Sequence, residues 1–303
     1  MMLADKQGNT PAIMDEGGLI YVLHEEEAAI RKNNDLKFPL VVRSNIYDCV
    51  DWMLTSEWDD DDFSNFHASK VNTHWHFLQF DNQSSDGVIT GFSNEQSVRP
   101  FTMLEKKTDK GLPLPLNTTF TKAAKKGERV ITVKNAAQYH PEIEILIGAD
   151  NVGGNEVGRI KSIKGNEITL VRPLKNDHPV KDIVTVEFVR QRFWVDSDVG
   201  TVFWHDHALG RITWGHGGFG TMIVEPVGST YHNPKTGAPI RSGPLADIRT
   251  AEPVGYGVNG SFRELLVQLN DSVPHTINIV TAGNPPGQPV EVALEAGKTI
   301  SFP

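Results

Sequence analysis

Two short histidine motifs stand out in this sequence because their spacing suits metal binding. His74 and His76 form the first histidine pair, and His205 and His207 form the second, each with one residue in between. On a β-strand, residues at i and i+2 point to the same face, separated by roughly 6.5 Å of rise. Two such imidazoles can hold two neighbouring metal ions, or one ion and its bridging partner. Neutral imidazole suits copper, and none of the four positions is a carboxylate or thiolate that would favour calcium or iron–sulfur chemistry.

The residues between the paired histidines are Trp75 and Asp206. On a strand they face away from the histidines, so we predict packing and surface residues here rather than ligands. Hydrolases of the metallo-β-lactamase type also begin with His-x-His, but they need Asp-His immediately afterwards. The first pair is instead followed by Phe77-Leu78-Gln79-Phe80, which excludes that class.

Other residues that could bind a metal ion have ordinary explanations. The acidic run Asp59–Asp62 could collect Mn²⁺ or Ca²⁺, which accept oxygen ligands, but we interpret it as a solvated loop. Cys49 is the only cysteine, which excludes a disulfide framework and a thiolate zinc site. We predict that the Cys49 thiol is semi-buried and binds no copper. His216 lies in a Gly-rich stretch and is interpreted as structural. The isolated histidines are predicted to be surface or packing residues: His24, His67, His140, His178, His232 and His275.

The elements that carry the histidine pairs are predicted to be β-strands. Apolar and polar residues alternate with period two, for example at Val50, Trp52 and Leu54, which should share one face. A turn is expected at Asp86-Gly87. The predicted strands of this region are Phe38–Leu54, Lys70–Phe80, Thr201–His207 and Thr221–Val224.

The remaining chain divides into segments of different character. Leu19–Leu23 predicts a strand, and Glu27 and Arg31 have the i,i+4 spacing that supports a short helix. A stretch of alternating runs, with a hairpin turn at Lys164-Gly165-Asn166, indicates a small inserted β-module. The predicted organisation is an N-terminal extension (1–36), a domain with both histidine pairs (37–118 plus 191–230), the insert (119–190), a Gly-, Pro- and Ser-rich linker (231–260), and the start of a further domain (261–303), where a strand pattern begins at Phe262.

Composition narrows the class of protein. The 303 residues include 27 glycines and 18 prolines between short apolar runs, which favours an all-β fold. A formal net charge of −9 argues against nucleic acid as a partner, because phosphate binding needs clustered Lys and Arg. The sequence contains no run of 18 apolar residues, so no membrane span is predicted. The start of the chain lacks the pattern of a secretory signal, so the protein stays in the cytoplasm or this chain is a piece whose signal lies elsewhere.

The residues around the histidine pairs resemble the first cupredoxin domain of the multicopper oxidases. The resemblance covers residues from about 38 to 117 and from 191 to 226. It rests on the order, spacing and flanking glycines of the motifs, although Phe77 replaces a glycine that follows the first pair in that family. The amino-acid sequence around Phe77–Arg99 is most similar to that of the large bacterial oxidases linked to manganese oxidation. The matching runs are His74–Gln79, Asp86–Val88, Glu95–Phe101, Gly200–His207 and Gly217–Pro226.

The resemblance implies a cupredoxin-like Greek-key sandwich, followed by the start of a second cupredoxin domain. It also implies a role for each histidine: His74 would bind a type 2 copper, His76 and His205 one type 3 copper, and His207 the other. Asp86 matches an aspartate that supplies protons or orients a bound water near the cluster, although Asp-Gly is also an ordinary turn. The implied reaction reduces dioxygen to water with electrons from a reduced metal ion or from a small organic reductant. Mn(II) is the first candidate for the metal ion.

The family's cluster takes four His-x-His pairs, and its type 1 copper takes a His-Cys-His sequence in a later domain. This chain has two pairs, so it is expected to be a fragment that lacks C-terminal cupredoxin domains. Such oxidases usually work outside the cytoplasm, in the periplasm or secreted. Two alternatives stay open: a copper-binding cupredoxin protein without turnover, for storage or resistance, and a structural cupredoxin domain that binds no metal.

Overall fold

The structure is a computed structural model that describes residues 2–3, 13–14, 18–33, 36–57, 70–80, 86–87, 96–100, 117–208, 210–253, 260–268, 290–295 and 298–302. These segments form β-strands and two short helices, α1 (Glu27–Lys32) and α2 (Gly210–Thr213). The predicted all-β fold class is confirmed. Neither helix has the length and apolar character needed to cross a bilayer.

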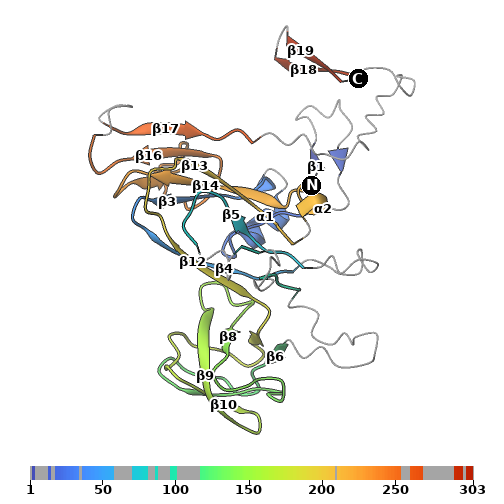
Figure 1. Ribbon diagram of the computed structural model, residues 1–303, viewed down its shortest axis with the longest axis vertical. Helices are drawn as coiled ribbons and strands as arrows, with labels where there is room; N and C mark the ends of the chain where they lie inside the picture. Colours follow the sequence, from blue (N-terminus) through green and yellow to red (C-terminus); the bar gives the residue numbers. More distant parts are fainter. Residues whose placement is uncertain are drawn as a thin grey trace.

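A sandwich of two sheets carries both histidine pairs (Figure 1). The first sheet has the strand order β3 (Val41–Asn45), β14 (Phe219–Glu225), β13 (Thr201–His205), β5 (His74–Trp75). Its strands pair antiparallel, except that β3 and β14 run parallel. The second sheet pairs β4 (Cys49–Leu54) antiparallel with β12 (Val189–Trp194). The two strands that lead into the histidine pairs, β5 and β13, are therefore neighbours in one sheet.

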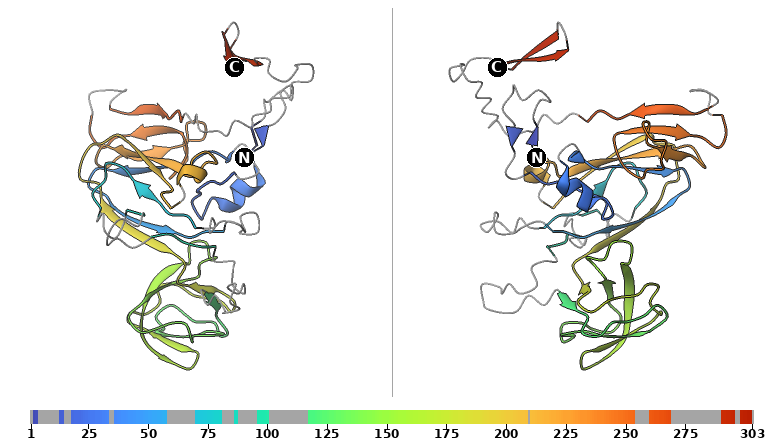
Figure 2. Two further views of the ribbon diagram at one scale, coloured as in Figure 1. Left: turned by 45° about the vertical axis from the view of Figure 1, so that its right-hand side comes forward. Right: turned by 180° about the vertical axis from the view of Figure 1, so that it is seen from behind.

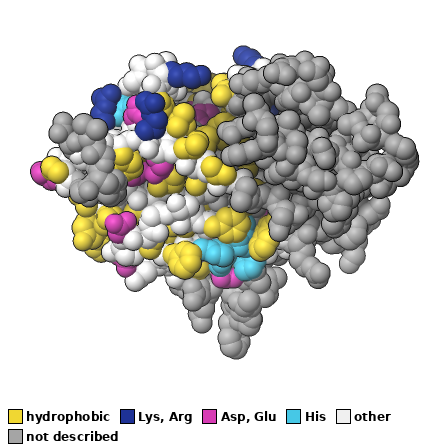
Figure 3. Space-filling model, turned by 90° about the horizontal axis from the view of Figure 1, so that it is seen from above, with side chains coloured by type: hydrophobic (Ala, Val, Ile, Leu, Met, Phe, Trp, Pro, Cys, Tyr) yellow, Lys and Arg dark blue, Asp and Glu magenta, His cyan; other side chains and the backbone are white. Residues whose placement is uncertain are grey.

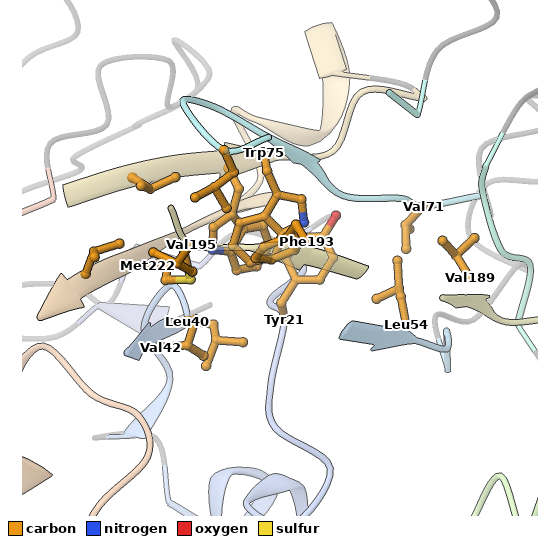
Figure 4. Close-up of a cluster of buried hydrophobic side chains, with 14 of the residues drawn as sticks. Tyr21, Leu40, Val42, Leu54, Val71, Trp75, Val189, Phe193, Val195 and Met222 are labelled. Atoms are coloured by element: carbon orange, nitrogen blue, oxygen red, sulfur yellow. The ribbon is translucent and has the colours of Figure 1, made fainter. Parts of the chain in front are cut away.

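Aromatic side chains fill the space between the two sheets (Figure 4). Trp75 and Trp204 lie with ring centroids 5.1 Å apart, and Trp52 from the facing sheet lies 5.0 Å from Trp75. Aromatic pairs of this kind contribute about 0.5–1.5 kcal/mol beyond the area they bury. Gly220 leaves room for the Trp204 indole, because a Cβ at Gly220 would lie 2.1 Å from that ring. The core thus fixes the residues next to the histidines.

The region predicted as an insert forms a sheet that shares no strand with the sandwich. Its hairpin turn at Lys164-Gly165-Asn166 is confirmed, since Lys164 pairs with Glu167 and Gly165 has a φ of +59°. The sheet has its own buried core and forms a separate lobe in the views of Figures 1 and 2. Its strand order is β6 (Asn117–Thr119), β11 (Ile183–Thr185), β8 (Glu144–Ile147), β9 (Glu156–Lys164), β10 (Glu167–Leu170), β7 (Val130–Thr132).

The segment predicted as a linker contains regular structure, which corrects that prediction. β15 (Thr230–His232), β16 (Leu245–Arg249) and β17 (Phe262–Leu265) form a three-stranded antiparallel sheet. Ala246 and Ile248 on β16 are fully buried, so apolar alternation persists within the Gly- and Pro-rich stretch. The strand predicted from Phe262 exists and pairs with β16 rather than with a later segment. Two short hairpins complete the described strands: β1 (Met2–Leu3) with β2 (Ile13–Met14), and β18 (Val290–Glu295) with β19 (Lys298–Phe302).

The long strand predicted at Phe38–Leu54 is two strands, because the chain changes sheets within it. The backbone N–H of Ile46 donates to the Glu225 carbonyl at the end of β14, whereas that of Tyr47 donates to Val195, just after β12. Tyr47 has a φ of +70°, which turns the chain between the sheets. In β4, Val50, Trp52 and Leu54 share the inner face, as predicted, while Cys49, Asp51 and Met53 are exposed. The semi-buried thiol predicted for Cys49 is therefore wrong.

Three further strand predictions are too long. The pattern at Lys70–Phe80 yields only β5, and the φ of +58° at Phe77 prevents the extended backbone from continuing past the first histidine pair. β13 ends at His205 instead of His207. Leu19–Leu23 forms no strand, and its N-terminal end is held by the Leu19 N–H donating to the His216 carbonyl at 2.8 Å. The predicted helix is confirmed as α1, with Arg31 2.5 Å from Glu27.

Candidate metal centre

The first histidine of each pair lies in a strand, directly opposite the other. In the β5–β13 ladder, His74 faces His205 and Trp75 faces Trp204. Both tryptophans are buried in the sandwich core, with exposed fractions of 2% and 0%. Because side chains alternate along a strand, the two histidines project from the opposite face. Ladder register therefore brings together histidines that are 131 positions apart in the sequence (205 − 74).

The second histidine of each pair lies just past its strand, which differs from the predicted strand positions. The backbone N–H of His76 donates to the Phe203 carbonyl at 3.1 Å. The backbone N–H of His207 donates to the side-chain Oδ1 of Asn72 at 2.7 Å. A neighbouring strand thus holds His76, whereas a side chain holds His207.

The four imidazoles form one cluster. The Nε2 atoms of His76 and His205 lie 3.0 Å apart, although they come from different pairs. Two nitrogens bound at about 2.0–2.1 Å to one metal ion have a similar separation when the angle between them is near 90°. The ring centroid of His74 lies 4.4 Å from that of His207. Two groups of side chains have ligand atoms close enough to hold a metal ion: His74, His76 and His205; and His74, Asp86 and His207.

Backbone carbonyls determine which ring nitrogens are free in His74 and His205. The Nδ1 of His74 lies 2.8 Å from the Asp86 carbonyl, and that of His205 lies 2.8 Å from the Asp206 carbonyl. A carbonyl only accepts, so each Nδ1 carries the hydrogen and each Nε2 keeps its lone pair. A hydrogen bond of this kind commonly orients a histidine that binds metal through its other nitrogen.

The surroundings favour neutral imidazole, which is the form that coordinates metal. Burial lowers the pKa of His205 to about 4, opposed by its hydrogen bond to the Asp206 carbonyl and assisted by the other histidines. Burial also lowers the pKa of His76, with smaller effects from His74 and His207. The Nδ1 of His207 is buried without a hydrogen-bond partner in the described part of the chain. These donors fit a metal ion that accepts nitrogen ligands, as copper does.

Asp86 lies beside the histidines. One carboxylate oxygen is 3.3 Å from the Nδ1 of His74, and the other is 3.7 Å from the Nδ1 of His207. The turn predicted at Asp86-Gly87 is present, with a φ of +87° at Gly87. The carboxylate is partly exposed, so it contacts both the cluster and solvent.

Several residues that support the centre were missed or misplaced from sequence. Asp206, predicted to be a surface residue, is fully buried, and its Oδ2 accepts the Thr213 hydroxyl at 2.7 Å. Gln191 reaches from β12 across the sandwich: its Nε2 donates to the Thr73 carbonyl and its Oε1 accepts the Thr73 hydroxyl at 2.7 Å. The indole of Trp75 donates to the same Oε1 at 3.2 Å, which confirms Trp75 as a packing residue. No local pattern marks Gln191, because its partners come from a distant strand.

The histidine cluster reaches the surface among aromatic side chains. Figure 3 shows histidine side chains grouped beside hydrophobic ones, with acidic atoms at their edge. Phe203 and Trp214 contact the His205 ring, with centroid distances of 5.2 and 4.2 Å. Phe77 follows the first pair and is 76% exposed. The cluster is therefore accessible from outside while its inner side is held by the sandwich.

The other metal-binding candidates do not join this cluster. Cys49 lies in β4 and pairs with Trp194. His178 is a packing residue of the insert, buried between Glu156 and Asp182 with ring nitrogens 3.1 and 2.8 Å from their carboxylates. Three candidates fall outside the described residues: Asp59–Asp62, His67 and His275.

No protein-family model matches the chain, and no curated protein matches its sequence.

Proposed function

We propose that this chain supplies half the copper ligands of a multicopper oxidase. The reaction would couple oxidation of a reduced metal ion or a small organic reductant to reduction of dioxygen to water, and Mn(II) is our first candidate for the reductant. The observation that carries this proposal is the convergence of both histidine pairs, with the Nε2 atoms of His76 and His205 3.0 Å apart. Convergence of two pairs on one point is what a shared metal ion requires.

Each residue has a distinct task in this proposal. His76 and His205 would hold one type 3 copper between them, His74 would bind the type 2 copper, and His207 the second type 3 copper. Bound copper would supply the electron transfer to dioxygen. The backbone carbonyls of Asp86 and Asp206 keep the Nδ1 hydrogens of His74 and His205 in place, which leaves a lone pair on each Nε2. In the structure, the Nε2 of His205 lies at hydrogen-bond distance from the Nε2 of His76, and a copper ion would take the place of that contact.

A copper-binding protein without turnover is the second candidate. Cys49 is the only cysteine of the sequence, and it is exposed on β4, where it pairs with Trp194. A type 1 copper needs a cysteine together with two histidines. The described part of this chain therefore offers no entry site for electrons, which favours storage or resistance unless another segment provides one. Oxygen uptake separates the two functions, because only the oxidase consumes dioxygen.

The test replaces the second pair in the full-length protein. We expect His205→Ala with His207→Ala to lose type 3 copper and to abolish oxygen reduction, because each type 3 ion loses a ligand. His140→Ala is the matched control, since His140 is an exposed histidine of the insert. Full copper content with normal oxygen uptake in the double variant would refute the proposal. Copper bound by the wild-type protein without oxygen uptake, in the presence of Mn(II) or an organic reductant, would establish the storage function instead.

A further inference from the structure

A buried asparagine lies between the two histidine pairs and the Asp86 turn. Asn72 precedes His74 by two residues and is 0% exposed. Its side-chain Oδ1 accepts the backbone N–H of His207 at 2.7 Å, and its Nδ2 donates to the carbonyl of Gly87. One carboxamide therefore joins the second pair to the turn that carries Asp86.

Both segments bound by this carboxamide lie outside the strands. β13 ends at His205, so the sheet does not hold the backbone of His207. Asp86 and Gly87 form a bend and belong to none of the described strands. The Asn72 carboxamide is therefore one of the contacts that set the position of His207 relative to Asp86, whose Oδ2 lies 3.7 Å from the Nδ1 of His207.

Only asparagine provides this pair of contacts at this side-chain length. Its carboxamide offers an acceptor and a donor on neighbouring atoms, whereas aspartate offers acceptors alone and leucine neither. The turn is also shaped around it. Gly87 has a φ of +87°, and a Cβ there would lie 2.7 Å from the Nδ2 of Asn72.

The backbone of Asn72 is anchored independently of its side chain. Its N–H donates to the Oδ1 of Asp206 at 2.9 Å, and its carbonyl accepts the hydroxyl of Tyr21 at 2.6 Å. The Tyr21 ring packs edge-on against Trp204 with centroids 4.8 Å apart. A change of the Asn72 side chain therefore leaves these contacts available, so variants retain support for folding.

We propose that Asn72 is a positioning residue of the metal centre, which sets the placement of His207 and Asp86 relative to His74. It binds no metal itself. Its carboxamide holds the backbone of a ligand and the turn of a proton-handling carboxylate at the same time. The inference deepens the proposed copper function and rests on it for the identity of the metal.

The test compares two substitutions in this chain. Asn72→Leu removes both side-chain hydrogen bonds at similar size, and we expect its affinity for Cu(II) to fall by about 10–100-fold, as is typical when a residue that orients a ligand is lost. Asn72→Asp keeps the acceptor for His207 but cannot donate to Gly87. We expect a smaller loss of affinity and an altered electron paramagnetic resonance spectrum of bound Cu(II). Competition titration with a chelator of known affinity measures the binding.

Two controls separate positioning from stability. Tyr21→Phe removes a hydrogen bond to the Asn72 carbonyl and keeps the carboxamide, so it should lower the melting temperature without changing copper affinity. Asn166→Asp makes the same chemical change in the insert, where the Asn166 carboxamide joins the Lys134 carbonyl to the Ala136 N–H. Wild-type affinity and an unchanged spectrum in Asn72→Leu would overturn the proposal. The proposal would also be overturned if Tyr21→Phe, with the same melting temperature as Asn72→Leu, lost as much copper affinity as Asn72→Leu does.

A measurement without metal distinguishes failure of this inference from failure of the proposed function. Amide hydrogen exchange reports whether the His207 N–H is held. We expect Asn72→Leu to accelerate exchange at His207 more than at His76, whose N–H is bound to the Phe203 carbonyl. If the wild-type chain binds no copper, the proposed function fails, and exchange at His207 still decides the positioning role. Unchanged exchange at His207 in Asn72→Leu would refute that role.

Discussion

Asp86 is the carboxylate that lies beside the histidine cluster. Its two carboxylate oxygens face the Nδ1 atoms of His74 and His207 at 3.3 and 3.7 Å, and the side chain keeps partial contact with solvent. A carboxylate between a metal centre and water can pass protons inward, or hold a bound water.

The proposed oxidase function predicts that Asp86→Ala in the full-length protein keeps most of its copper and reduces oxygen far more slowly. Positioned proton transfer typically contributes about 10²–10⁴-fold in rate. Asp86→Glu should recover part of the rate, mostly at lower pH, where protons are more available. Copper content, melting temperature and oxygen uptake are measured on the same samples. If the rate per cluster in the Ala variant equals that of the wild type, Asp86 serves only as a turn residue.

Phe77 adopts a backbone conformation that glycine would adopt more easily. Its φ is +58°, and its side chain is 76% exposed, so little packing offsets the conformational cost. Left-handed backbone costs a non-glycine residue about 1–2 kcal/mol, while glycine costs about 0.5–1 kcal/mol in lost backbone freedom. The same position is glycine in the family that the sequence resembles.

We therefore predict that Phe77→Gly raises the free energy of unfolding by about 0.5–1 kcal/mol. Phe77→Ala is the matched control, because it removes the ring but keeps the Cβ that causes the strain. Urea denaturation of the two variants beside the wild type gives the comparison. Equal midpoints for the Gly and Ala variants would show that backbone conformation is not the cause.

At the level of elements, the insert and the sandwich are built on separate sheets. The insert sheet begins at Asn117 and its last strand ends at Thr185, whereas β12 of the sandwich begins at Val189. Glu187 belongs with the sandwich side, because its carboxylate accepts two hydrogen bonds from Arg99. The backbone N–H of Arg99 donates at 2.9 Å, and the guanidinium of Arg99 donates at 3.0 Å. The structure therefore moves the practical boundary of the insert to before Glu187.

We predict that replacing residues 117–186 by a short Gly/Ser linker leaves the sandwich folded with its histidine cluster intact. Loop closure depends only weakly on length, at about 0.6 kcal/mol per doubling. Cooperative thermal melting and copper binding of the deletion variant are the measurements. A second deletion that also removes Glu187 should be less stable, since it takes away both hydrogen bonds to Arg99. Aggregation or loss of cooperative melting in the first deletion would show that the sandwich needs the insert.

At the scale of the whole molecule, a buried charge cluster joins the sandwich to the three-stranded sheet. The Arg43 guanidinium of β3 donates to the carboxylate of Glu264 in β17 at 2.8 Å and to the Gly243 carbonyl at 2.6 Å. Glu225 at the end of β14 lies 3.8 Å from the Nε of Arg43. Burial, with the negative charge of Glu264, raises the pKa of Glu225 to about 7 despite Arg43. Two carboxylates thus share one guanidinium at this junction.

This raised pKa makes part of the stability depend on pH. The folded state holds a proton on Glu225 that the unfolded chain releases near its ordinary pKa of about 4.5. The stabilisation is therefore complete below about pH 4.5 and is lost as the pH rises through about 7. We predict that Glu225→Gln, which stays neutral, gains stability relative to the wild type as the pH rises from 5 to 8. Melting temperatures across this range test it, and parallel profiles for the two proteins would refute it.

Local sequence was sufficient to predict the all-β class, the insert's hairpin and the four histidines as candidates. Those features depend on neighbouring residues, since strand alternation and the i,i+2 spacing are properties of short segments. The strand ends were wrong where a single residue, such as Phe77 or Tyr47, has a positive φ. The predicted linker failed because composition outweighed the alternation at Ala246 and Ile248.

The tertiary structure alone decided that the two pairs share one site and which residues hold them there. Asn72 and Asp206 are 134 positions apart, and Thr73 and Gln191 are 118 apart, so no local pattern connects them. Asp206 was assigned to the surface from strand alternation, yet it is buried because the strand ends before it and the chain folds back over it through Thr213. Hydrogen bonds between distant segments have no signature in a single sequence, because either partner alone looks like an ordinary polar residue.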